Sequence, residues 1–86
     1  MRYNVAVFRS RSETLYFANM LKNYGMFVSI MNTPRTCQAA CGICVKFLPD
    51  NFFEVKSLLS TKPFNTFIGF YVVAFSNGRM DVERIF

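Results

Sequence analysis

All three cysteines of the chain fall within eight consecutive residues, in the segment Pro34-Arg35-Thr36-Cys37-Gln38-Ala39-Ala40-Cys41-Gly42-Ile43-Cys44. The segment begins with a turn-forming proline and lies between two apolar runs. A cysteine thiolate can act as a nucleophile or as a metal ligand. The sequence therefore places any chemistry of this protein at residues 34–44, and the competing interpretation is a loop whose cysteines are incidental.

The spacing of Cys37, Cys41 and Cys44 is Cys-x3-Cys-x2-Cys, which radical S-adenosylmethionine enzymes use to hold three irons of a cluster. Such enzymes need a much larger α/β barrel. Small iron–sulfur and zinc sites require a fourth ligand, and this chain has neither a fourth cysteine nor a histidine. We therefore expect no cofactor and no metal. A small Cys-ligated metal or iron–sulfur site remains the alternative.

Thiol chemistry at Cys41 is the other interpretation. The absence of histidine excludes a Cys-His dyad, so the thiolate must be favoured by a nearby cation or by oriented backbone amides. Arg35 could provide the cation, and the backbone around Gly42, which allows close approach, could provide the amides. Cys37 is a candidate resolving thiol. Cys44 is a further candidate, for which a small strand residue without a chemical role is the competing interpretation.

The bulk composition indicates one small domain with an excess of apolar surface. The chain has 86 residues, of which 52% are hydrophobic and 17% charged, and the surplus predicts a homo-oligomer or a partner surface. The net charge of +5 comes from scattered basic residues and allows an anionic partner without specifying one. The longest apolar run, residues 67–75, is far below the roughly 20 residues that cross a bilayer. With no secretory signal and an odd number of cysteines, we expect a cytoplasmic protein without a membrane partner.

Hydrophobic periodicity predicts the elements that position the cysteine segment. Strands are expected at 3–8, 26–31, 43–48 and 67–75, and helices at 13–24 and 50–59. Ser10 and Glu13 fit a capping box, Gly25 can end the first helix, and Asp50 can cap the second. The order βαββαβ is typical of an α+β, ferredoxin-like split βαβ fold, an antiparallel sheet with both helices on one face. We expect this domain at 1–76, followed at 77–86 by a tail that forms an edge strand or docks.

Alternation along the strands also predicts which face each side chain occupies. The residues expected beneath the helices are Val5, Val7, Val28, Ile30, Ile43, Val45 and Phe47. The opposite face would then present Phe8, Phe27 and Met31. We expect another copy, the tail or a partner to cover these side chains.

The pairs Pro34-Arg35 and Cys41-Gly42, followed by the strand at 43–47, carry a family resemblance. The chain resembles the small bacterial domains described as putative selenium/sulfur carrier protein-like, from the opening strand to the Pro-Asp-led second helix. The resemblance implies that Cys41 is the carrier cysteine, with Arg35 and Gly42 as its neighbours. It implies a carrier, or a sulfurtransferase-like protein, more than an independent catalyst. Cys41 would take a persulfide or perselenide from a donor such as a cysteine desulfurase and deliver it to an acceptor protein.

RNA binding is the alternative function, because RNA-recognition domains share the split βαβ architecture. Residues 68–75 match the aromatic RNA-binding octamer at Gly69, Phe70, Val73 and Phe75. The match lies on the fourth expected strand instead of the third and lacks the leading Lys or Arg. The pattern therefore favours a buried aromatic strand and disfavours a nucleic-acid partner. An interaction module that dimerises through its open sheet face is a further alternative.

Overall fold

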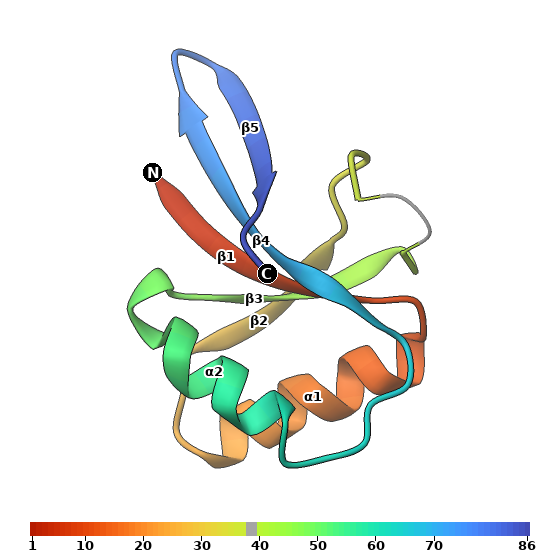
Figure 1. Ribbon diagram of the computed structural model, residues 1–86. Coiled ribbons are helices and arrows are strands. Elements are labelled where there is room, and N and C mark those ends of the chain that lie inside the picture. Colours follow the sequence, from red (N-terminus) through yellow and green to blue (C-terminus); the bar gives the residue numbers. More distant parts are fainter. Residues whose placement is uncertain (38–39) are drawn as a thin grey trace.

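The computed structural model describes residues 1–37 and 40–86 and shows a sheet with two helices packed on one face (Figure 1). The elements are β1 (Arg2–Phe8), α1 (Arg11–Asn23), β2 (Val28–Asn32), β3 (Ile43–Phe47), the 3-10 turn η1 (Pro49–Asn51), α2 (Phe52–Leu59), β4 (Phe67–Ser76) and β5 (Arg79–Arg84). The strands lie in the order β2-β3-β1-β4-β5, and all neighbours are antiparallel. The first four strands and two helices confirm the ferredoxin-like βαββαβ arrangement.

The first helix begins where the sequence predicts, but only half of the capping box forms. The Ser10 hydroxyl accepts a hydrogen bond from the Glu13 amide at 3.2 Å. The Glu13 carboxylate turns instead to the segment before β4, where it accepts from the amides of Asn65 at 3.0 Å and Thr66 at 2.9 Å. The hydrogen bond from the Asn65 amide, followed by one from the Thr66 hydroxyl, holds the pKa of Glu13 below its usual value. Glu13 thus ties the first turn of α1 to the entry of β4.

The second helix begins later than predicted. Pro49–Asn51 form a 3-10 turn, and α2 follows without a side-chain cap. The prediction of Asp50 as the cap is wrong, because Asp50 lies inside that turn instead of at the residue before it. Val55 is the fully buried residue of this helix. Three neighbours on the helix pack against the same core, and these are Phe52, Leu58 and Leu59.

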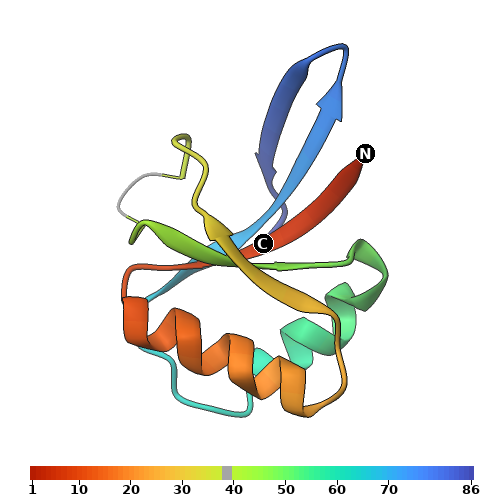
Figure 2. The same cartoon turned by 180° about the vertical axis from the view of Figure 1, so that it is seen from behind.

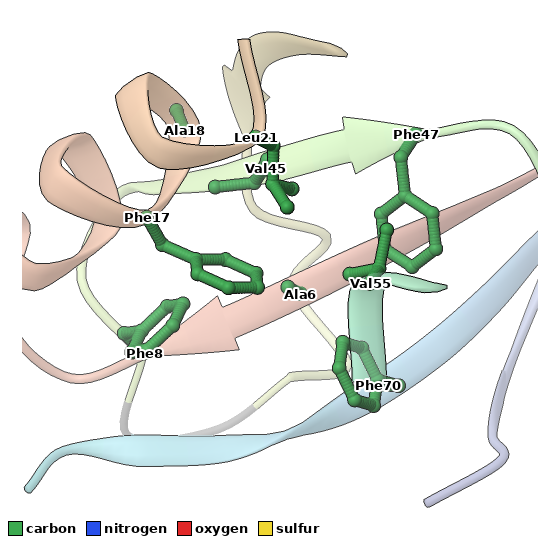
Figure 3. Packing of buried hydrophobic residues seen from close by; sticks show 9 residues of the cluster. All are labelled: Ala6, Phe8, Phe17, Ala18, Leu21, Val45, Phe47, Val55 and Phe70. Atoms are coloured by element: carbon green, nitrogen blue, oxygen red, sulfur yellow. The ribbon is translucent and has the colours of Figure 1, made fainter. Parts of the chain in front are cut away.

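The main core lies between the helices and the sheet, as Figure 3 shows. Its buried residues are Ala6, Phe8, Phe17, Ala18, Leu21, Val45, Phe47, Val55 and Phe70. Val28 and Ile30 pack against this cluster, as predicted. The prediction for β1 is wrong, because Ala6 and Phe8 face the helices, whereas Val5 and Val7 face the other way. The Phe8 ring lies 5.5 Å from the Phe17 ring, measured between centroids.

The second face of the sheet carries a smaller buried cluster of Tyr3, Val5, Val7, Cys37, Cys44 and Val73, which we call the cysteine-side cluster. The segment after β2 lies on this side of the sheet, away from the helices (Figures 1 and 2). Met31 packs against this cluster, which confirms the prediction that it lies on the face opposite the helices. Part of the face expected to await a partner is therefore covered by the chain's own loop. Phe27 is left 86% exposed.

The tail residues form β5, an edge strand that pairs with β4 through a tight turn at Asn77 and Gly78. Both turn residues have positive φ, 51° and 74°, as a two-residue hairpin turn requires. The Arg84 side chain crosses Gly69 and donates to the Ile68 carbonyl at 2.8 Å. Within the part of the chain that the structure describes, no helix has both the length and the apolar character needed to cross a membrane.

Candidate functional site

Cys41 is fixed in place by its own backbone. Its amide donates to the Phe8 carbonyl at 3.2 Å, which ties the loop to the last residue of β1. Its carbonyl accepts from the Thr33 hydroxyl at 3.0 Å, and the Thr33 amide donates to the Gly42 carbonyl, also at 3.0 Å. The two ends of the loop are therefore closed directly beside Cys41, at the entrance to β3.

The Cys41 sulfur lies beside the first turn of α1. The side chain is partly buried, and its Sγ is 3.1 Å from the Ile43 carbonyl oxygen and 3.5 Å from Thr14 Oγ1. The beginnings of α1 and of β3 lie at the same end of the sheet (Figures 1 and 2). The amides of a helix's first turn have no partner within the helix and favour negative charge nearby. An anionic sulfur at Cys41 would therefore have a favourable neighbour in α1.

Cys37 and Cys44 have different surroundings, because both are buried in the cysteine-side cluster. Burial raises the pKa of the Cys37 thiol, against a smaller opposing effect of a hydrogen bond from Thr36. Burial raises the pKa of Cys44 to about 12, although a hydrogen bond from Thr33 opposes the shift. Both thiols are thus held in the protonated form at neutral pH, and Cys41 alone among the three cysteines is partly accessible.

The two remaining predicted residues, Arg35 and Gly42, are exposed. Among the described residues, no hydrogen bond or ion pair joins Arg35 to Cys41. The Arg35 charge can therefore act on the sulfur only at longer range. Within residues 1–37 and 40–86, no three Cys, Asp or Glu side chains are grouped so as to hold a metal ion.

Thr14 is the neighbour of Cys41 that the sequence interpretation did not include. It is fully buried and lies on the same helical stripe as Phe17, Ala18 and Leu21. A hydroxyl on an otherwise apolar stripe requires a hydrogen-bond partner, which was the available signal. The Ser10 carbonyl already meets this requirement at 2.9 Å, and Cys41 lies 27 residues further along the chain, so local patterns could not identify the contact with its sulfur.

The octamer at 68–75 forms the middle of β4, and three of its four matching residues are built into the fold, whereas the fourth, Phe75, is 41% exposed. Phe70 and Val73 are fully buried, Phe70 beneath the helices and Val73 in the cysteine-side cluster. Gly69 is covered by the Arg84 side chain. The Phe70 ring therefore has no free face on which an RNA base could stack.

Comparison with known proteins gives a match to one family model. No curated protein and no solved structure matches the chain. The family model described as "Putative Se/S carrier protein-like" matches residues 3–67. This match runs from β1 to the first residue of β4 and includes the whole loop that carries Cys41. Because the match covers more than half of the chain, the chain belongs to the putative Se/S carrier protein-like family.

Proposed function

We propose that this protein carries sulfur or selenium as a persulfide or perselenide on Cys41. The contrast among the three cysteines supports this role: Cys41 is partly accessible and lies beside the start of α1, whereas Cys37 and Cys44 are buried among apolar side chains. The family to which the chain belongs is consistent with such cargo. Without histidine and with one accessible thiol, the chain suits a carrier better than an independent catalyst.

The transfer step is an exchange at sulfur. The Cys41 thiolate attacks the outer sulfur of a donor protein's persulfide, R-S-SH. A bond forms between Cys41 Sγ and the outer sulfur, and the donor's S–S bond breaks with its electron pair passing to the donor sulfur. The products are Cys41-S-SH and the donor thiolate, so atoms and charge balance without an added oxidant or reductant. In delivery, an acceptor thiolate attacks the outer sulfur of Cys41-S-SH, and Cys41 leaves as the thiolate. Selenium can replace the outer sulfur in the same scheme.

The test is intact-mass measurement after incubation with a cysteine desulfurase and cysteine. We expect the mass to increase by one sulfur atom, and peptide mapping to place that sulfur on Cys41. The gain should disappear on treatment with a thiol reductant and in the Cys41→Ser variant. Cys37→Ala and Cys44→Ala are the matched controls, and both should still acquire the sulfur. Undiminished uptake by Cys41→Ser would reject Cys41 as the carrier residue.

Selenium is tested in the same way, with selenocysteine as the substrate of the donor enzyme. A gain of one selenium atom on Cys41 identifies perselenide as a cargo, whereas a gain with cysteine alone restricts the cargo to sulfur. The acceptor is then sought by mixing the loaded protein with individual candidate thiol proteins and following the loss of the added mass.

A further inference from the structure

The Thr14 hydroxyl lies between two acceptors but has only one hydrogen to donate. Thr14 Oγ1 is 2.9 Å from the Ser10 carbonyl oxygen and 3.5 Å from Cys41 Sγ. The Cys41 sulfur also lies 3.1 Å from the Ile43 carbonyl oxygen, which can only accept. With Cys41 as a thiol, its S–H therefore points to Ile43, and the Thr14 hydrogen points to Ser10.

Ionisation of Cys41 changes this arrangement. When the thiol releases its proton to solvent, the sulfur has no hydrogen left for the Ile43 carbonyl, and two electron-rich atoms then face each other. An anionic sulfur favours a donor, and the nearest side-chain hydroxyl is that of Thr14, at 3.5 Å. Rotation about the Cβ–Oγ bond is enough to turn its hydrogen from Ser10 toward the sulfur.

The Ser10 carbonyl does not lose its last partner when the Thr14 hydroxyl turns away. It also accepts the Thr14 amide at 3.1 Å, which is the first hydrogen bond of α1. A partly buried acceptor that keeps one donor avoids most of the penalty of an unpaired group. The Thr14 hydrogen can therefore move to the sulfur at little cost to the helix.

We propose that Thr14 is a positioning residue for Cys41, whose hydroxyl turns from the Ser10 carbonyl to the sulfur when that sulfur is anionic. It thereby favours the thiolate and holds it in one orientation beside α1. Its action on a persulfide anion rests on the proposed carrier function, whereas its action on the thiolate does not. Thr14 forms no bond to the cargo in this scheme.

The test is the pH dependence of Cys41 alkylation by iodoacetamide, followed by peptide mapping. Thr14→Val keeps the branched shape but removes the hydroxyl, and we expect it to raise the pH midpoint by about half to one unit. Below the midpoint, alkylation should slow by roughly three- to tenfold, as that shift implies. Thr14→Ser, which keeps the hydroxyl, should restore the wild-type profile, a rescue that a purely structural role of the methyl group would not produce.

Thr61→Val is the matched control, because the Thr61 hydroxyl also donates to a helix carbonyl, that of Leu58 at 2.7 Å, but Thr61 lies just after α2 and not on α1. It should leave the midpoint unchanged. Thermal unfolding confirms that each variant is folded, and Thr14→Ala replaces Thr14→Val if the valine variant does not fold. An unchanged midpoint in the folded variant without the hydroxyl overturns the role of Thr14.

Sulfur uptake from the desulfurase separates this role from the carrier function. A raised midpoint in Thr14→Val, together with no sulfur uptake by the wild-type protein, supports the role of Thr14 and overturns the carrier. An unchanged midpoint in Thr14→Val, together with sulfur uptake by the wild-type protein, overturns the role of Thr14 and supports the carrier. A raised midpoint with slower uptake by Thr14→Val, restored in Thr14→Ser, supports both.

Discussion

The amide of Cys41 and the carbonyl of Phe8 are joined by a hydrogen bond of 3.2 Å, so the cysteine of the candidate site is attached to a core residue. The Phe8 ring is fully buried and packs 5.4 Å from the Phe64 ring and 5.5 Å from the Phe17 ring, measured between centroids. The position of Cys41 therefore depends on the packing of the helix-side core.

Replacement of Phe8 should consequently affect both stability and the site. Phe8→Ala removes a large buried ring and should lower the free energy of unfolding by about 3–5 kcal/mol, whereas Phe8→Leu should cost about half of that. In the leucine variant, loosening of the end of β1 should also change the rate of Cys41 alkylation. Urea unfolding and native-state labelling measure the two effects. Ala74→Gly, on β4 and outside both buried clusters, is the control that should reduce stability without changing the alkylation rate. Identical alkylation in Phe8→Leu would show that the loop is held independently of this core.

The fold could be predicted well because most of its determinants are local. The alternation along β3 places Val45 beneath the helices and Cys44 on the opposite face, as the structure confirms. The serine cap of α1 was likewise visible in the sequence, since it requires only the residues of one turn.

The error in the facing of β1 occurs because both faces of this strand are apolar. In β1, Val5 and Val7 alternate with Ala6 and Phe8, so both faces of the strand are hydrophobic and periodicity could not decide which one meets the helices. Val5 and Val7 are buried on the other face together with residues that are distant in sequence, among them Cys37 and Val73. The candidate site shows the same division: its cysteines could be found by spacing, but the contact with Thr14 could not.

Alkaline pH should destabilise the protein in part through Cys44. Its pKa is raised from 9.0 to about 12, mainly by burial, so between these values the unfolded chain releases a proton that the folded protein keeps. The contribution of Cys44 to stability is therefore complete below pH 9.0 and is lost as the pH rises toward 12, by up to about 1.4 kcal/mol per pH unit. Urea unfolding of Cys44→Ala should show a shallower decline over this range. The raised pKa of Tyr3, which is due mainly to burial, should leave a residual slope. Equal slopes in wild type and Cys44→Ala would contradict the assignment.

Acid should destabilise the protein in part through Glu13. Hydrogen bonds from the Asn65 amide and from Thr66 lower its pKa from 4.5, so its contribution is present above this value and is lost as the pH falls through the lower, folded-state pKa. Thermal unfolding from pH 6 downward should show a steeper fall in midpoint for the wild type than for Glu13→Gln, which should already be less stable at neutral pH. Glu54→Gln, on α2, is the matched control. A parallel fall in wild type and Glu13→Gln would rule out this link between α1 and β4.

Arg35 should influence Cys41 weakly and in a salt-dependent way. Because the side chain is exposed and forms no described contact with the sulfur, its charge acts through water. Arg35→Gln should slow alkylation of Cys41 by about twofold at low ionic strength, and the difference should vanish at about 1 M salt, where the screening length is about 3 Å. Arg79→Gln, on β5, is the control and should have no effect. A larger, salt-resistant loss in Arg35→Gln would mean that the guanidinium contacts the sulfur directly.

The attachment of Cys41 at its amide and its carbonyl limits how far a sulfur atom carried on it, as proposed, can travel. Carriers that use a flexible tail or a long prosthetic arm can move their cargo between distant active sites. Here both backbone groups of Cys41 are bonded, to Phe8 and to Thr33, so only rotation within the side chain can move the sulfur. Its reach is therefore a few ångströms, roughly the length of two or three covalent bonds. Under the proposed function, a donor or acceptor has to bring its own reacting atom to Cys41, on a mobile segment or through a surface shaped to fit around the loop.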